Sequence, residues 1–118
     1  MLKVNENCKV TGIYKRLVKE PAKTSKFIIA LKIKQNDDKI KKQYITICKT
    51  DLGEQLNLLM NKQIGRIYAT NDMEDIDIFF DNMKNKYCIE CSPVDGKYEQ
   101  FYFEKENFEK ELINMFGN

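Results

Sequence analysis

Tyrosines and basic residues occur together on several short segments in the first seventy residues of the chain. An aromatic ring can stack on a nucleic-acid base of any identity, and lysine or arginine can neutralise the neighbouring phosphates. A tyrosine on a strand is also an ordinary half-buried residue, so the prediction depends on the coincidence of tyrosines with positive charge. The candidate nucleic-acid-binding residues are Tyr14, Lys15, Arg16, Lys32, Lys34, Tyr44, Lys49, Arg66 and Tyr68.

The sequence offers little for catalysis. It has no histidine, the residue most often used as a general acid or base and as a metal ligand. It also lacks a glycine-rich phosphate-binding loop and a Gly-x-Ser-x-Gly motif. We therefore expect a protein that is not an enzyme and that needs no cofactor.

Four cysteines raise the question of a metal or redox site. Cys88 and Cys91 form a single C-x-x-C motif, and Cys8 and Cys48 stand alone, whereas structural zinc sites usually show two paired motifs. Two residues three apart on a strand also point to opposite faces. We therefore expect no metal, and we interpret the cysteines as small buried thiols in a reducing compartment.

The charge of the chain is unevenly distributed. The net charge is +2, but residues 1–50 hold 13 Lys and Arg against 4 Asp and Glu, and residues 51–118 hold 7 against 14. This asymmetry fits a basic face that binds phosphate, and it fits equally a lysine-rich surface that only confers solubility. The acidic second half supports an alternative hypothesis, a small protein-interaction module or inhibitor from a phage or mobile element that docks on a basic partner.

One acidic segment within that half could in principle bind a divalent cation, but we interpret it as a solvated face. Its residues are Asp72, Glu74, Asp75 and Asp77.

The first seventy residues predict four strands and one helix. Strands are expected at 9–18, 27–34, 42–49 and 64–70, because β-branched and aromatic residues dominate them and apolar residues alternate with polar ones. A short helix is expected after Thr50-Asp51, with its leucines on one face. The residues expected to fill the core are Ile13, Ile29, Leu31, Ile33, Ile45, Ile47 and Ile67.

The second half is harder to interpret. Residues 72–85 fit a strand or a helix, and the helix is favoured here. A strand at 87–92 and a strand at 98–104 flank a turn at 94–97, and residues 106–116 have the spacing of a terminal helix. The strand at 97–104 is a candidate edge through which the protein could form a homo-oligomer.

The order strand, strand, strand, helix, strand is that of the OB-fold. We therefore expect a mainly β protein whose 118 residues form one OB-fold-like domain. A five-stranded Greek-key barrel should occupy residues 8–93, with the helix between strands 3 and 4. Residues 94–118 should add a C-terminal hairpin and helix.

Two blocks of the sequence resemble the bacterial single-stranded DNA-binding proteins. Residues 9–21, KVTGIYKRLVKEP, are similar to that family's opening strand and its Lys-Asp-Pro turn. Residues 44–66 are similar to its third strand, its leucine-spaced helix and its Gly-Arg strand. The resemblance covers about residues 8–70 and implies binding of single-stranded DNA with little sequence preference. Its setting would be the replication, recombination or DNA transfer of a phage, plasmid or conjugative element, and RNA is not excluded.

The sequence also bears on location. No apolar stretch approaches the roughly 20 residues that span a bilayer, and the opening residues lack the basic and apolar regions of a signal peptide. We therefore expect a cytoplasmic protein with no membrane partner.

Overall fold

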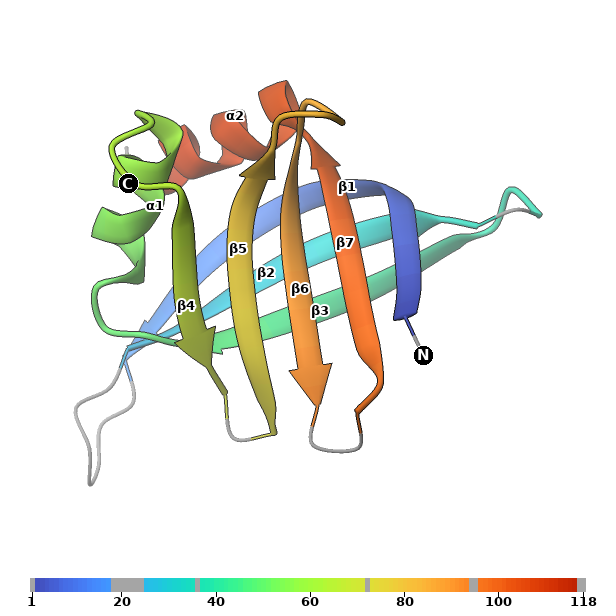
Figure 1. The fold of residues 1–118 in the computed structure, drawn as a ribbon, viewed down its shortest axis with the longest axis horizontal. Helices are drawn as coiled ribbons and strands as arrows, with labels where there is room; N and C mark the ends of the chain where they lie inside the picture. The colour runs from blue at the N-terminus through green and yellow to red at the C-terminus, as the bar shows by residue number, and fades with distance from the viewer. Residues whose placement is uncertain (1, 18–24, 36, 72, 94–95, 117–118) are drawn as a thin grey trace.

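Seven strands form a closed barrel, and two helices lie at one end of it (Figure 1). The structure is a computed structural model that describes all residues except 1, 18–24, 36, 72, 94–95 and 117–118. The elements are β1 (Leu2–Leu17), β2 (Ser25–Lys34), β3 (Ile40–Cys48), α1 (Leu52–Met60), β4 (Arg66–Thr70), β5 (Glu74–Asp81), β6 (Lys86–Pro93), β7 (Tyr98–Glu104) and α2 (Lys105–Phe116). Within these ranges, no helix is long and apolar enough to cross a membrane.

Strands β1, β2 and β3 form an antiparallel meander whose faces follow the alternation of the sequence. On β2, Phe27, Ile29, Leu31 and Ile33 are buried, and Lys32 between them is exposed. The expected core residues of β1, β3 and β4 are buried as well. The alternation therefore predicted both the strands and their inner face correctly.

Helix α1 follows β3, as expected, and buries Leu52, Leu56 and Leu59. These leucines recur at intervals of three and four residues, which places them on one face of a helix. Helix α2 buries Phe108 and Leu112 in the same core. The two helices lie near each other at one end of the barrel, where Figure 1 shows them above β4 and β5.

The segment favoured as a helix at 72–85 contains a strand instead, β5 (Glu74–Asp81), so that prediction was wrong. Ile76 and Ile78 point into the core, and the register pairs β5 with β4 on one side and β6 on the other. Strands on both sides satisfy the backbone of β5, and this tertiary pairing decides between two sequence patterns of similar strength.

The barrel has seven strands in sequential order, so the predicted five-stranded Greek-key barrel is corrected. It closes where β1 runs parallel to β7, from Leu2 opposite Tyr98 to Cys8 opposite Phe103. Strand β7 is thus a barrel strand flanked by β6 and β1, neither part of an appended hairpin nor an edge. The turn predicted at 94–97 includes residues 94–95, which lie outside the described residues.

The weakest joint of the barrel lies between β3 and β4. In the described part of the chain, the register pairs these strands only at Cys48 and Thr70. The Asn71 side chain donates a hydrogen bond to the Thr46 carbonyl at 2.9 Å, where a neighbouring strand would otherwise bond. At this joint, both β3 and β4 therefore have a largely free strand edge.

Strand β1 bends sharply because it changes partners along its length. Its register shifts between Asn5 and Cys8 against β7, and again between Val10 and Gly12 against β2. At the second shift, Asn107 of α2 accepts a hydrogen bond from the Val10 N–H at 2.8 Å and donates one to the Val10 carbonyl at 3.0 Å. One amide side chain thus satisfies both backbone groups of the residue at the bulge.

We predict that Asn107→Ala lowers the free energy of unfolding by about 1 to 3 kcal/mol, because it leaves two partly buried backbone groups without partners. Asn114→Ala is the matched control, since Asn114 is exposed on the same helix and should change stability by less than about 0.5 kcal/mol. Urea unfolding followed by circular dichroism measures both. Equal stability of the two variants would show that Asn107 does not hold the bulge.

Candidate nucleic-acid interface

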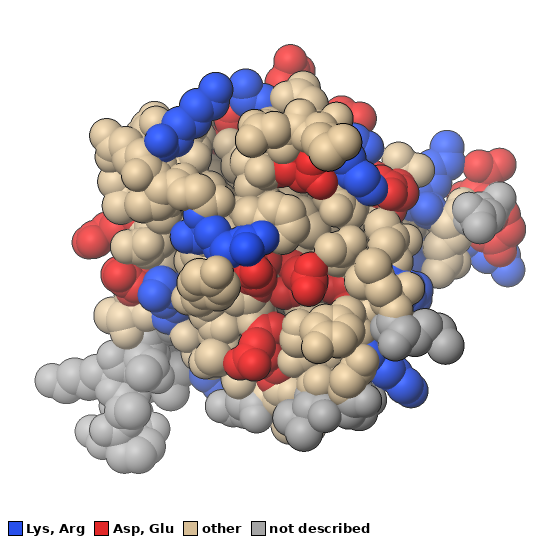
Figure 2. Space-filling view, viewed as in Figure 1, with Lys and Arg blue, Asp and Glu red and all other residues tan. Residues whose placement is uncertain are grey.

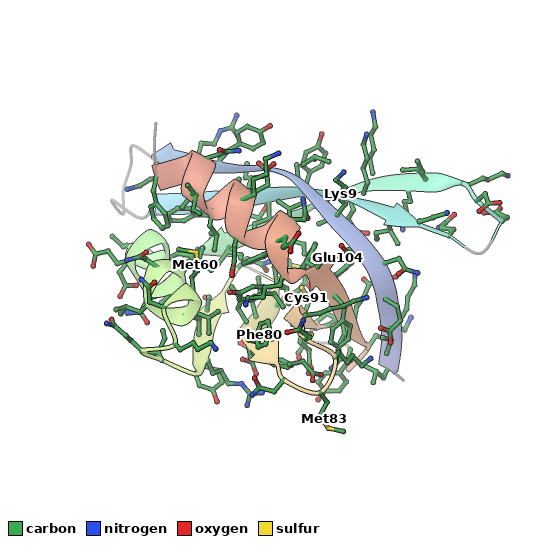
Figure 3. All side chains as sticks on the ribbon, turned by 90° about the horizontal axis from the view of Figure 1, so that it is seen from above. Lys9, Met60, Phe80, Met83, Cys91 and Glu104 are labelled. Atoms are coloured by element: carbon green, nitrogen blue, oxygen red, sulfur yellow. The ribbon has the colours of Figure 1, made fainter. Side chains whose placement is uncertain are left out.

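Three lysines form a row across the outer face of the β1–β2–β3 sheet. The register places Lys9 opposite Lys32, and Lys32 opposite Lys42. All three side chains are exposed, and none forms a salt bridge with another described residue. Figure 3 shows Lys9 on β1, whereas Phe80 lies on the opposite side of the barrel. The row therefore presents unneutralised positive charge to solvent.

Two tyrosines stand beside this row. Tyr14 of β1 is 57% exposed and Tyr44 of β3 is 67% exposed, so both rings lie outside the core. Between them is a shallow groove of about 400 Å³, lined by Tyr14, Ala30, Lys32, Lys42 and Tyr44 among others. The methyl group of Ala30 lies directly opposite Tyr44 in the register, and its small size leaves the space between the rings open.

The position of the Tyr14 ring depends on Gly12. A Cβ atom on Gly12 would lie 2.5 Å from the Tyr14 hydroxyl oxygen and 2.7 Å from Cζ, closer than such atoms can approach. The ring therefore lies back over the glycine at the β1 bulge. Thr11, the bulged residue, donates a hydrogen bond from its hydroxyl to the Ala30 carbonyl at 3.2 Å and ties the bulge to β2.

Three other predicted residues lie on β1 and β2 but outside the groove. Arg16 is exposed two residues beyond Tyr14 on the same strand. Lys15 pairs with Phe27 in the register, and its Nζ lies 5.9 Å from the centre of that ring. Lys34, at the end of β2, forms an exposed ion pair with Asp38 at 3.7 Å, so part of its charge is already balanced.

The remaining predicted residues lie elsewhere. Arg66 and Tyr68 are on β4, whose outer face belongs to the β4–β7 sheet shown in Figures 1 and 2. The Arg66 Nε lies 3.1 Å from an Asp77 carboxylate oxygen, and its guanidinium lies 4.7 Å from the centre of the Phe79 ring. Lys49 forms an ion pair with Asp51 at 3.3 Å. The structure therefore does not bring these three residues to the Tyr14–Tyr44 groove.

Acidic side chains gather on the outer face of the β4–β7 sheet, and Figure 2 shows them near its centre. Asp77 is paired with Glu90 across strands β5 and β6. Burial raises the pKa of Asp77, the nearby Arg66 charge opposes this shift, and the Glu90 charge adds to it. We call Asp77 and Glu90 the acidic strip. Arg66 balances part of the Asp77 charge, and the net negative charge that remains is unfavourable for phosphate.

Sequence reasoning missed Lys9 and Lys42, because their relation to Lys32 depends on strand register. All three occupy outward positions of their strands, and that alternation was available in the sequence. The pairing that aligns them across three strands was not. The outward position of Ala30 also follows from the alternation of its strand, but its place at the floor of a groove does not.

The cysteines are buried free thiols, as predicted, apart from Cys48, which is half-buried. Cys91 points into the core, whereas Cys88 lies on the other face of β6 beside Tyr102. Burial is the main reason that the pKa values of Cys8, Cys88 and Cys91 rise to about 12. Metal binding and redox exchange need thiolates, so these raised values disfavour both. Among the described residues, no cluster of Cys, Asp or Glu could hold a metal ion.

Comparisons with protein-family models, curated proteins and solved structures find no match to this chain. The functional argument therefore depends on the geometry of the chain itself.

The buried thiols predict that the protein loses stability in alkaline solution. The pKa of Cys88 rises from 9.0 to about 12 on folding, so above pH 9 the unfolded chain releases a proton that the folded protein retains. The free energy of unfolding should fall by up to about 1.4 kcal/mol per pH unit for each such thiol. Urea unfolding at pH 8, 9, 10 and 11 measures the slope, and Cys88→Ala should make it shallower. A variant with the same slope as the unaltered protein would contradict this assignment.

Proposed function

We propose that this protein is a non-catalytic binder of single-stranded nucleic acid, with DNA as the expected ligand. The observation that carries the proposal is the pair of exposed tyrosines, Tyr14 and Tyr44, beside a row of three lysines that have no ion-pair partner among the described residues. This face therefore offers aromatic rings on which bases can stack and positive charges that can bind the phosphates.

The spacing of the groups suits a strand that crosses the sheet. Adjacent strands lie about 4.8 Å apart, so the row from Lys9 to Lys42 extends about 10 Å across β1, β2 and β3. Tyr14 and Tyr44 also lie on the two outer strands of the three, with the small Ala30 between them. The groove therefore has room for a base against each ring while the phosphates contact the lysines.

The same chemistry accounts for weak sequence preference. Ring stacking and phosphate contacts do not read the hydrogen-bonding edges of the bases. The acidic strip of Asp77 and Glu90 favours a single binding face, because phosphate is repelled from the β4–β7 sheet. The resemblance of residues 8–70 to single-stranded DNA-binding proteins supports the same ligand. A role in the replication, recombination or transfer of a mobile element is part of the proposal.

A second candidate function is supported by the acidic strip itself. A face that carries Asp77 and Glu90, with the exposed ring of Tyr68 nearby, could dock on a basic surface of a partner protein. The chain would then act as an interaction module or inhibitor. The two candidates use opposite faces of the barrel, so a nucleic-acid binding experiment distinguishes them.

The first test is a salt titration of binding to a fluorescent oligo-dT. Each phosphate contact made by a lysine contributes about 0.7 to the slope of log affinity against log salt for single strands. Replacing Lys9, Lys32 and Lys42 together with Gln should reduce that slope by roughly 2. Lys110→Gln, on the exposed side of α2, is the control for a lysine outside the interface. No binding by the unaltered protein would overturn this proposal and leave the acidic face as the candidate.

The second test separates stacking from folding at Tyr44. Tyr44→Ala should weaken oligo-dT binding by about 1 to 3 kcal/mol, and Tyr44→Phe should bind almost as well as the unaltered protein, because stacking uses the ring. Thermal unfolding should change little in either variant, since the Tyr44 ring is 67% exposed.

Gly12→Ala tests the same interface without removing a ring. The added methyl group must push the Tyr14 ring away from the bulge, which an exposed side chain can do with little loss of stability. Affinity should fall while the melting temperature stays nearly constant. If Tyr44→Ala and Gly12→Ala both bind oligo-dT like the unaltered protein, the stacking surface lies elsewhere.

A further inference from the structure

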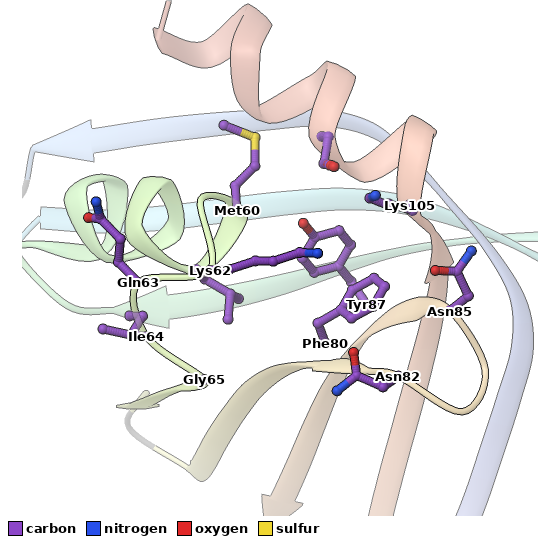
Figure 4. A pocket seen from close by; sticks show the side chains of 12 residues that line it. Met60, Lys62, Gln63, Ile64, Gly65, Phe80, Asn82, Asn85, Tyr87 and Lys105 are labelled. Carbon is purple, nitrogen blue, oxygen red and sulfur yellow. The ribbon is translucent and has the colours of Figure 1, made fainter.

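A second cavity lies at the helical end of the barrel and shares no residue with the groove. It has a volume of about 480 Å³ and opens between the end of α1, the β5–β6 turn and the start of α2 (Figure 4). Small-molecule sites usually measure about 300 to 1,000 Å³ and combine an apolar wall with a few polar groups. This cavity has both kinds of lining.

The apolar wall is fixed by the core behind it. Phe80 and Met60 line the cavity and pack against the main hydrophobic cluster. Phe80 meets Tyr87 edge-on with ring centres 4.9 Å apart, and Tyr87 stacks on the buried Phe108 at 4.6 Å. Aromatic contacts on both sides hold the Tyr87 ring in place, so the wall presents a rigid surface suited to a flat ring.

One oxygen of a carboxylate in the lining lacks a hydrogen-bond partner. The Glu109 Oε2 atom is inaccessible to solvent, and no hydrogen bond from a described residue reaches it. The Tyr87 hydroxyl interacts with the same carboxylate, and its pKa rises to about 12 through burial, through the charge of Glu109 and through a hydrogen bond to it. Buried acceptors in proteins are nearly always paired. An N–H donor on a ligand would supply this partner after a rotation of the Glu109 side chain that brings Oε2 to the cavity.

Two lysines supply positive charge to the same cavity. Lys62 follows α1 and extends toward the rings of Tyr87 and Phe80 in Figure 4, and Lys105 enters from the start of α2. Both are exposed, and neither forms a salt bridge within the described ranges. Two ammonium groups at the rim of one pocket favour a doubly charged anion such as a phosphate monoester.

We propose that this cavity binds a purine nucleoside 5′-monophosphate whose ring carries an amino group. The ring would lie against Phe80 and Met60, its amino group would donate to Glu109, and its phosphate would contact Lys62 and Lys105. An aromatic amino acid fits less well, because its ammonium group would lie beside the two lysines. This proposal does not rest on strand binding at the Tyr14–Tyr44 groove.

Calorimetric titration of the unaltered protein tests the proposal with three ligands. Adenosine 5′-monophosphate should bind. Adenosine, which has no phosphate, should bind at least about tenfold more weakly. Purine riboside 5′-monophosphate, which has no amino group, should also bind about tenfold more weakly than adenosine 5′-monophosphate. No heat with adenosine 5′-monophosphate at millimolar concentration would overturn the proposal. Equal binding of the two monophosphates would overturn the assigned role of Glu109.

Variants locate the binding within the protein. Glu109→Gln should weaken adenosine 5′-monophosphate about tenfold and leave purine riboside 5′-monophosphate nearly unchanged, because only the first ligand carries the donor. Glu106→Gln, on the exposed surface of the same helix, is the matched control. Tyr44→Ala should bind the mononucleotide normally, which separates this cavity from the strand-binding groove. If Glu109→Gln weakens both monophosphates equally, the proposed contact to the amino group is wrong.

Discussion

Strand β1 must hydrogen-bond to β7 along its first part and to β2 along its second, and it changes partners at Cys8, which is paired with both strands. A strand cannot do this with continuous pairing, so it bends at two register shifts. The Asn107 side chain bonds both backbone groups of Val10 at the second shift and thereby links α2 to the bulge. Barrel closure, the position of α2 and the placement of Gly12 under the Tyr14 ring all follow from this arrangement.

Because of the barrel fold, the uneven distribution of charge along the chain becomes a difference in charge between two faces of the molecule. The lysine-rich first half forms β1, β2 and β3, and the acidic second half forms β4 to β7. The β1–β2–β3 sheet and the β4–β7 sheet lie on different sides of one core, so the basic and acidic residues point in different directions. A net charge of only +2 is therefore compatible with a locally basic surface. The two helices at one end leave both outer sheet faces uncovered.

Local patterns in the sequence were sufficient for much of the fold. The alternation from Phe27 to Lys34 predicted β2 and its buried face, and the leucine spacing after Asp51 predicted α1. The pattern of residues 72–85 was compatible with two structures, and only the strands on both sides made β5 a strand. The prediction of the strand order was wrong for a related reason. The barrel closes through pairing between β1 and β7, which are about a hundred residues apart in the sequence, and local patterns do not reveal such a pairing.

For the candidate sites too, local sequence patterns predicted which side chains are exposed but not which residues lie together. Exposure of Tyr14 and Tyr44 could be inferred from alternation, but the row of lysines needed the register of three strands. The cavity beside Glu109 could not be inferred at all, because its lining comes from α1, the β5–β6 turn and α2. Arg66 was expected to contact phosphate on the basis of its charge, and the structure places Asp77 next to it. The sequence gives the charge of a residue, but it does not show which residues lie next to it in the fold.

The single backbone pair between β3 and β4 sets where this barrel can open. Elsewhere in the described structure, adjacent strands share several pairs, so separating them breaks many hydrogen bonds at once. At the β3–β4 joint, only Cys48, Thr70 and the Asn71 side chain hold the strands together. Amide protons on the free edge of β3 exchange with solvent without any unfolding, whereas those of β6 require the sheet to separate. The β3–β4 joint, next to the strand that carries Tyr44, is therefore where two neighbouring strands can separate with the fewest backbone hydrogen bonds broken.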